Sequence, residues 1–571
     1  MPTRALSPAR RPVALLALLA ALCAALGLGR PATAENAEWP KLAKEFAEQF
    51  KAKPGVSLEQ KRKAVNSLAK SNDLRAVDLL AGVLDDQEKY AGKLRKEWEE
   101  GEAAWKEKTD RLQKVVDEKS RQAKERGEST VSLTPEEAEW LGANNQPGKM
   151  EEAKRQLGTK YRNVMAEEAL AVGIVRAMAR VVNTLEGDEL DKATAKVVGG
   201  ATAAKDARKF IYLQGLGYAK GERITAFLET MTKDSSVDLV QAALEALGRQ
   251  NSERGADILI AKLDDTRWQV RASAIAGLGF YRNGAVVGKV MDAMLERAKK
   301  EDGVLQRNFF VAMAKIVQEA VPATIEAWES WWKSNREEMI KKFSSREGNG
   351  LPVEEDPPDM IVETNQGSSS FYGITTTSKH IIFVVDVSGS MRVDSKDPSK
   401  ENPGPEDKAR IVIAREELKK ALQTLSATDT DDRGNATFNI VVFSSDVTVY
   451  KEGKMIDATK KNKEDAMKWI DEKVVAEGMT NIFDAMEQAF NIISATSDAK
   501  NLKKGADTIF LMTDGAPNRG KFFEPDLIVA EVKKLNAKRK MTIHTIGVGE
   551  GHDPRLLREL AATNGGQYLA R

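Results

Sequence analysis

The sequence predicts a multidomain protein in which an all-α solenoid of helical repeats precedes an α/β domain with a doubly wound, mostly parallel sheet. With 571 residues, the chain is too long for a single hydrophobic core. Apolar helical patterns recur at a constant spacing in the middle of the chain, which indicates stacked helix pairs. After residue 379, short apolar runs alternate with helical patterns, which is typical of parallel strands joined by crossover helices.

Residues 1–34 have the composition of a secretory signal peptide. Arginines at positions 4, 10 and 11 precede an apolar run, and Ala32-Thr33-Ala34 fits an A-x-A cleavage site. An uncleaved anchor is the alternative, because the apolar run approaches the length that crosses a bilayer. We expect cleavage, which leaves no integral membrane span. The expected location of the exported protein is the periplasm or the extracellular space.

Cysteine content and charge exclude several classes of function. Cys23 is the only cysteine, so the chain after residue 34 would have no disulfide, thiol nucleophile or cysteine-ligated zinc. Such an exported chain without disulfides favours a bacterial origin. Lys and Arg total 87 and Asp and Glu total 86, for a formal net charge of +1. This balance gives no electrostatic reason to expect a nucleic-acid partner.

One helical motif is repeated at a spacing of 31 residues. It has two apolar residues three positions apart followed by glycine, and it stands at residues 213–217, 244–248 and 275–279. Helix pairs that cannot bury their apolar faces alone stack in this way. The pattern resembles HEAT repeats, and we expect a HEAT-like array at residues 186–342 with related helices at 35–88. A generic helical bundle is the alternative.

The segment between these helical regions, residues 89–185, is highly charged and rich in helix-forming residues. Three apolar residues recur there every seven positions: Trp98, Trp105 and Leu112. Gly101 and Lys108 interrupt the pattern where a coiled coil needs a second apolar position. We therefore expect a long helix packed along one side or a helical hairpin, with its tryptophans in the packing rather than in a binding stripe.

Residues 343–378 contain prolines, glycines and a serine run, and we interpret them as a linker. An α/β domain is expected at residues 379–571. Its expected strands are 381–386, 439–443, 447–451, 508–512, 541–548 and 567–570, and its expected helices are 408–425, 464–475, 482–494, 526–538 and 554–562. Between the first strand and first helix, residues 392–407 form a long polar loop.

Oxygen-bearing side chains follow two of these strands. The first strand stops at Asp386, and Ser388 and Ser390 follow at alternate positions. A later strand ends in the sequence LMTDG, which contains Asp514, and the turn GMTN between them contains Thr480. Because ligands bind at the carboxyl ends of parallel strands, we expect these side chains to meet. Oxygen-only donors suit a hard divalent cation such as Mg²⁺.

These residues resemble the metal-ion-dependent adhesion site of a von Willebrand factor type A (VWA) domain. That site has the pattern Asp-x-Ser-x-Ser, then Thr, then Asp, and all of its positions match here: Asp386, Ser388, Ser390, Thr480 and Asp514. The resemblance implies that these side chains hold Mg²⁺, with Mn²⁺ as an alternative, and leave one coordination position for an Asp or Glu of a partner. The alternative is that they only cap turns, and Thr480 is equally suited to begin a helix.

Enzymatic activity is not expected. Phosphatases with an aspartyl nucleophile need a second acid two residues after it, but Ser388 stands there. The three histidines, His380, His544 and His552, are not accompanied by a G-x-S-x-G nucleophile motif, and no phosphate-binding loop occurs.

The main hypothesis is an exported adhesion or protein-interaction protein that binds an acidic ligand residue through Mg²⁺. In this hypothesis, the helical repeats offer a surface for a second protein partner. The rival hypothesis is a helical-repeat scaffold in which the metal site is structural or vestigial. A third idea is a partner subunit of a metal-inserting or secretion machine whose ATPase is another chain. The export signal argues against it, because these ATPases work in the cytoplasm.

Overall fold

The structure is a computed structural model. It describes residues 38–50, 55–128, 131–141, 148–344, 361–362, 369–393, 408–426, 430–431, 434–494 and 505–571. The expected signal peptide, most of the expected linker and residues 394–407 of the polar loop lie outside the described residues. Among the described helices, none combines the length and the apolar composition that crossing a membrane requires.

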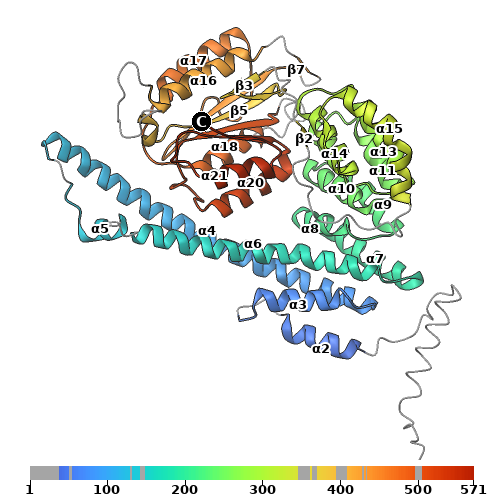
Figure 1. The fold of residues 1–571 in the computed structure, drawn as a ribbon. Coiled ribbons are helices and arrows are strands. Elements are labelled where there is room, and N and C mark those ends of the chain that lie inside the picture. Colours follow the sequence, from blue (N-terminus) through green and yellow to red (C-terminus); the bar gives the residue numbers. More distant parts are fainter. Residues whose placement is uncertain are drawn as a thin grey trace, which may run out of the picture.

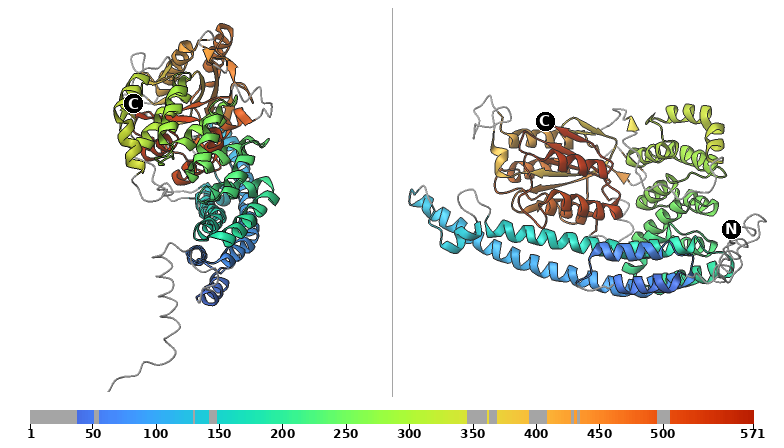
Figure 2. Two further views of the ribbon diagram at one scale, coloured as in Figure 1. Left: turned by 90° about the vertical axis from the view of Figure 1, so that its right-hand side faces the viewer. Right: turned by 60° about the horizontal axis from the view of Figure 1, so that its bottom comes forward.

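A hairpin of two long helices extends along one side of the molecule (Figures 1 and 2). Helix α4 covers Leu74–Glu125 and helix α6 covers Lys149–Val182, with the short helix α5 (Pro135–Leu141) between them. Helix α5 begins with a capping box, in which Thr134 and Glu137 exchange side-chain-to-backbone hydrogen bonds. Of the two alternatives for the charged segment, the structure shows the hairpin.

Helix α4 runs without a break through residue 88, where we expected one segment to end and another to begin. Leu84, Ala91 and Trp98 are buried at intervals of two helical turns, so a single apolar stripe crosses this position. The N-terminal helices α2 (Trp39–Gln49) and α3 (Leu58–Leu68) precede it. Because α4 continues into the hairpin, residues 35–88 are not a separate structural unit.

The solenoid follows the hairpin as a stack of helix pairs (Figure 1). Its helices are α7 (Gly187–Ala203), α8 (Asp206–Leu216), α9 (Glu222–Met231), α10 (Val237–Gln250), α11 (Glu253–Lys262), α12 (Trp268–Leu278), α13 (Val287–Ala298), α14 (Gly303–Val317) and α15 (Ile325–Ser344). Their apolar faces form one continuous core with α2, α3 and the adjoining part of the hairpin. The expected all-α repeat architecture is confirmed.

The repeated glycines allow neighbouring repeats to approach closely. A Cβ atom on Gly248, in α10, would lie 2.3 Å from the carbonyl oxygen of Gly277 in α12. A Cβ atom on Gly217, after α8, would lie 2.9 Å from Cα of Ala246 in α10. The glycine of the 31-residue motif is therefore required by backbone packing between consecutive repeats.

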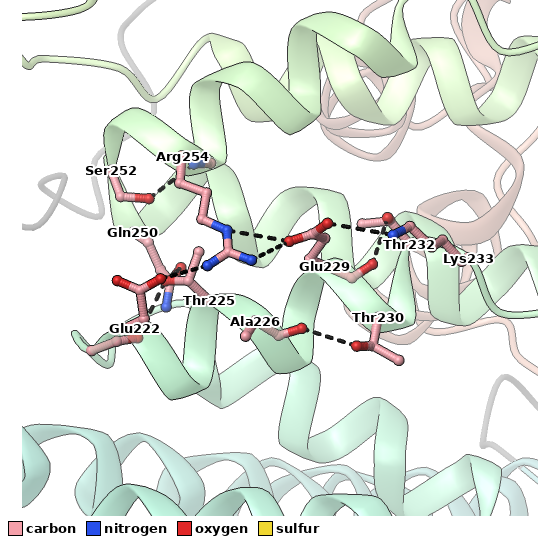
Figure 3. A network of polar contacts seen from close by, with 12 residues as sticks. Glu222, Thr225, Ala226, Glu229, Thr230, Thr232, Lys233, Gln250, Ser252 and Arg254 are labelled. Atoms are coloured by element: carbon pink, nitrogen blue, oxygen red, sulfur yellow. Dashed lines mark hydrogen bonds and ion pairs between the residues drawn. The ribbon is translucent and has the colours of Figure 1, made fainter. Parts of the chain in front are cut away.

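Polar contacts also join neighbouring helix pairs, as Figure 3 shows for α9 and α11. Arg254 of α11 donates hydrogen bonds to Glu222, at the start of α9, and to Glu229, two helical turns further along the same face of α9. Thr225 donates to the side chain of Gln250, which donates in turn to a backbone carbonyl of the preceding repeat. These contacts fix the register of the stack around its apolar core.

The C-terminal domain has a sheet with the strand order β10-β8-β5-β11-β12-β13, and β9 also pairs with β8. Its strands are β5 (His380–Asp386), β8 (Thr437–Phe443), β9 (Val447–Val449), β10 (Ile456–Asp457), β11 (Thr508–Thr513), β12 (Thr542–Gly547) and β13 (Tyr568–Ala570). The neighbours from β8 to β13 are parallel, whereas β9 and β10 run antiparallel to β8. The expected doubly wound, mostly parallel sheet is confirmed.

Helices cover both faces of this sheet (Figure 1). On one face lie α16 (Arg410–Thr424) and α17 (Lys460–Lys473), and on the other lie α18 (Ile482–Ser494), α20 (Pro525–Arg539) and α21 (Pro554–Thr563). The fully buried strands β5 and β11 lie between the two layers, which explains their uninterrupted apolar sequences.

Part of the expected linker belongs to the sheet domain. The hairpin of β3 (Ser369–Phe371) and β4 (Ile374–Thr376) places Phe371 in the core, with ring centroids 5.2 Å from Phe383 and 5.7 Å from Phe510. The linker boundary at residue 378 is therefore too late. The apolar residues of this hairpin, Phe371, Tyr372 and Ile374, are all buried in the core of the domain.

The sheet domain rests on the helical hairpin through a shared apolar core. Phe522, in the loop before α20, stacks on Trp98 of α4 with a centroid separation of 5.4 Å and contacts Tyr161 of α6 at 4.6 Å. All three side chains are buried. The expectation that Trp98 serves packing is confirmed, because its ring lies 4.3 Å from that of Tyr161 within the hairpin and 5.4 Å from that of Phe522 in the C-terminal domain.

Candidate metal site

The five predicted site residues lie at the carboxyl edge of the sheet, where β5 and β11 run side by side. Asp386 is the last residue of β5, and Asp514 directly follows β11; neither side chain is exposed to solvent. Register places Val385 beside Met512, so the residue next to Asp386 on β11 is Thr513. The Thr513 hydroxyl donates a 2.5 Å hydrogen bond to Asp386 Oδ2.

The two serines lie on a tight turn that begins at the end of β5. The Ser388 N–H donates to Asp386 Oδ1 at 2.7 Å, and a short 3₁₀ helix follows (Gly389–Arg392). Ser388 Oγ and Ser390 Oγ are 3.1 Å apart, and Ser390 Oγ donates to Asp514 Oδ1 at 2.7 Å. Ser388 is buried and Ser390 is exposed, so the site has one side open to solvent.

Thr480 reaches the same place from the loop before α18. A Cβ atom at Gly515 would lie 3.1 Å from Thr480 Oγ1 and 3.8 Å from Ser390 Oγ, so both hydroxyls converge beside this glycine. The alternative that Thr480 begins the helix is wrong, because Asn481 Oδ1 accepts the hydrogen bond from the N–H of Asp484. The structure thus brings all five predicted side chains together.

The Thr480 loop is held by Gly478, which belongs to the predicted turn, and by Asn518, which the sequence did not single out. The Thr480 N–H donates to Asn518 Oδ1 at 2.8 Å, and the Asn518 N–H donates to the Thr480 carbonyl at 3.1 Å. Gly478, at φ +75°, accepts a hydrogen bond from the Gly389 N–H at 3.0 Å. These bonds join the Thr480 loop to the turn that carries Ser388 and Ser390 and to the loop that follows Asp514.

Arg410 is the other residue that sequence reasoning missed. Its Nη1 lies 2.8 Å from Asp514 Oδ2, and the two side chains are 6% and 0% exposed. Arg410 begins α16 and continues the buried stripe that includes Ala414 and Leu418. A basic residue in line with an apolar helical stripe was the available signal, because an isolated charge is buried only with a partner.

The electrostatics of the site favour a bound cation. Burial, together with the charge of nearby Asp514, raises the pKa of Asp386 to about 7, against the hydrogen bonds from Thr513 and Ser388, which lower it. Two buried carboxylates and three hydroxyls form an oxygen-only donor set that fits a hard divalent cation. No cluster of three or more His, Cys, Asp and Glu side chains that could hold a metal occurs among the described residues.

Comparisons with known proteins match two parts of the chain. Residues 380–570 match the von Willebrand factor type A domain family, and residues 202–279 match the HEAT repeat family. Inter-alpha-trypsin inhibitor heavy chain H4 from human is 31% identical over 200 residues, which is 35% of this chain and 18% of that protein. The mouse inter alpha-trypsin inhibitor, heavy chain 4, is 30% identical over 199 residues, again 35% of this chain and 18% of that protein. The chain therefore matches less than a fifth of the length of these relatives.

Among solved structures, a von Willebrand factor type A protein from Catenulispora acidiphila is 21% identical, with a TM-score of 0.26, covering 34% of this chain and 39% of that one. The manganese-loaded TRAP protein of Plasmodium vivax is 20% identical, with a TM-score of 0.24, covering 32% of this chain and 64% of that one. From the family matches, this chain combines HEAT repeats with a C-terminal von Willebrand factor type A domain.

Proposed function

We propose that this protein binds an acidic side chain of a protein partner through Mg²⁺ held in its VWA domain. The HEAT repeats and the VWA domain both support a role in protein interaction. The signal-like composition of residues 1–34 supports export to the periplasm or the extracellular space, and a bacterial origin stays a prediction. The proposed role is binding without catalytic turnover.

The observation that carries this proposal is the convergence of three hydroxyls and two buried aspartates on one edge of the sheet. Ser388, Ser390 and Thr480 would supply neutral oxygens to the cation, while Asp386 and Asp514 lie behind them. Neutral ligands leave a divalent cation with much of its positive charge, so a carboxylate is the preferred ligand for an open position. Mn²⁺, which accepts the same oxygen donors, is an alternative ion.

Each residue of this chain has a distinct part in the proposed site. Asp386 is fixed by its bonds from Thr513 and the Ser388 backbone, which orient its carboxylate without using a charged donor. Ser390 is exposed and would face the incoming partner. When bound, the cation would supply the positive charge that attracts the partner's carboxylate.

The test is metal-dependent binding of a polyglutamate peptide to the full chain, measured by fluorescence anisotropy with excess Mg²⁺ or excess EDTA. Polyglutamine is the uncharged control peptide. We expect the wild type to bind polyglutamate with Mg²⁺ but not with EDTA. Ser390→Ala should lose this binding. Thr448→Ala, a change at an exposed residue of β9, is the control and should keep it. Binding that persists in EDTA, or in Ser390→Ala, would contradict the proposal and favour a scaffold in which the repeats carry the interaction.

A further inference from the structure

The second aspartate of the metal site already has a cationic partner within the protein. Arg410 Nη1 lies 2.8 Å from Asp514 Oδ2, and both groups are buried. Asp386, in contrast, receives hydrogen bonds from a hydroxyl and a backbone N–H, which carry no charge. The two carboxylates of the site therefore differ in how far their negative charge is neutralised.

The guanidinium of Arg410 has little freedom to leave this position. A Cβ atom on Gly549, at φ +67°, would lie 2.3 Å from Arg410 Nη2 and 2.6 Å from its Cζ, so the group lies flat against a glycine backbone. The Arg410 N–H donates to the Val393 carbonyl at 3.0 Å, next to the turn that carries the serines. The Arg410 guanidinium is thus held by the fold around the site, and its pair with Asp514 is not a surface ion pair.

One donor of this guanidinium remains available. Arg410 Nε is buried and has no hydrogen-bond partner among the described residues. Buried donors are nearly always satisfied by protein, water or ligand. This unpartnered donor belongs to the guanidinium that pairs with Asp514, so the group can still bind one further acceptor.

Resting on the proposed function, we propose that Arg410 determines the anion specificity of the VWA site by neutralising Asp514. With both carboxylates ionised, as metal binding requires, the two aspartates and Arg410 together carry one net negative charge. A divalent cation then leaves the occupied site with one net positive charge, which an acidic side chain can neutralise. Without Arg410 the occupied site would be neutral, so the cation would bind more tightly and the acidic partner more weakly.

The test uses the full chain and titrates Mn²⁺ by calorimetry, followed by polyglutamate binding at saturating Mn²⁺. Arg410→Gln removes the charge but keeps a donor toward Asp514, and Arg410→Lys keeps the charge. We expect Arg410→Gln to bind Mn²⁺ about tenfold more tightly and polyglutamate about tenfold more weakly, and Arg410→Lys to stay within about threefold of the wild type for both. Unchanged or weaker Mn²⁺ binding in Arg410→Gln would overturn the inference.

A paired variant covers the case in which Arg410→Gln does not fold, since an unpaired buried carboxylate is costly. Arg410→Met combined with Asp514→Asn removes both charges together and leaves the net charge of the site unchanged. Asp514→Asn alone lacks the same carboxylate but keeps the positive charge of Arg410, so we expect the paired variant to bind Mn²⁺ at least about tenfold more tightly than Asp514→Asn alone. Equal or weaker Mn²⁺ binding by the paired variant would overturn the inference, because the charge of Arg410 would then not act on the ion. If wild-type protein binds Mn²⁺ but not polyglutamate, the proposed function fails, while the Mn²⁺ affinities still decide the role of Arg410.

Discussion

The VWA domain contacts the rest of the chain through two surfaces of different character. Against the helical hairpin, Phe522 packs on Trp98 and Tyr161, which also contact each other, in a buried aromatic cluster. Against the solenoid, contacts include exposed or half-exposed ion pairs, such as Lys538 with Asp238 at 3.0 Å. Buried aromatic packing contributes far more to stability than ion pairs at the surface. The hairpin contact is therefore expected to hold the domain in place.

The hairpin surface is also the one connected to the metal site. The loop after Asp514 contains Asn518, which bonds to Thr480, and Arg519, which lies 2.8 Å from Asp110 of α4. The same loop then reaches Phe522 in the aromatic cluster. One short segment thus links two metal-site residues to the hairpin. The ion pairs with the solenoid are made by Lys538 and Lys540, at the end of α20, and by Lys379, at the opposite end of β5 from Asp386.

The largest expected effect is that of Phe522→Ala. Removing this buried ring opens the core shared by the hairpin and the VWA domain, and we expect a loss of about 3–5 kcal/mol in the free energy of unfolding. Mn²⁺ affinity should also fall, because the loop that holds Thr480 loses its anchor. Urea unfolding and Mn²⁺ titration measure the two effects. Phe280→Ala, at a half-buried position of the solenoid, is the control and should leave Mn²⁺ affinity unchanged. If Phe522→Ala kept the stability and the Mn²⁺ affinity of the wild type, the hairpin contact would not be the one that holds the VWA domain in place.

The solenoid can be weakened without changing the metal site. A Cβ atom on Gly248 would meet the backbone of Gly277, so Gly248→Ala should destabilise the protein by about 1–3 kcal/mol. Gly199→Ala is the matched control, since no atom lies within 4 Å of a Cβ atom there, and alanine should be neutral or stabilising by up to about 1 kcal/mol. Thermal unfolding distinguishes them, with Mn²⁺ affinity unchanged in both. Equal effects of the two substitutions would refute the close approach of the repeats.

A buried histidine near the solenoid predicts a pH dependence of stability. Burial lowers the pKa of His544 to about 3, with the positive charge of Arg307 on α14 adding to it. The folded protein keeps His544 neutral, whereas the unfolded chain gains a proton below about pH 6.5. The contribution of neutral His544 to the free energy of unfolding is complete above about pH 6.5. It is lost as the pH falls toward 3, at up to about 1.4 kcal/mol per pH unit.

The measurement for this prediction is the urea midpoint at pH 7 and at pH 5.5 for the wild type and His544→Phe. The phenylalanine keeps a ring against Phe510 but cannot titrate. It also loses a hydrogen bond from the Gln567 N–H, which lowers stability equally at both pH values. The wild type should lose more stability than the variant between pH 7 and 5.5, and the same loss in both would show that His544 is not responsible.

The smallest expected effect is that of the ion pair between Lys538 and Asp238. Both side chains are more than a third exposed, so the pair should contribute about 0.2–1 kcal/mol or less. A double-mutant cycle with Lys538→Ala and Asp238→Ala measures this coupling in urea. A coupling above about 2 kcal/mol would mean that the solenoid surface also holds the VWA domain firmly.

The sequence predicted the parts of this structure that depend on local patterns. Helix α18 has the predicted bounds, and β5 and β11 are bounded by the polar residues that marked their ends. The five candidate metal residues could be chosen because each follows a strand or lies in the turn before a helix, at the edge where parallel strands place their ligands.

The sequence could not predict contacts between residues far apart in the chain. Trp98 and Phe522 meet only because the hairpin and the VWA domain dock, and no spacing relates them. Arg410 and Asp514 are 104 residues apart in the chain, so no local pattern relates the two members of this pair. The continuity of α4 was missed because charge composition changes at residue 88 while the buried stripe does not.

The central claim is that the edge of the VWA sheet binds one divalent cation through the five gathered side chains. Electron paramagnetic resonance of free Mn²⁺ during titration into the full chain tests it most directly. We predict one ion per wild-type chain, loss of that ion in Thr480→Ala and retention in the control Thr448→Ala. No saturable Mn²⁺ binding by the folded wild type, or equal binding by Thr480→Ala, would contradict the account.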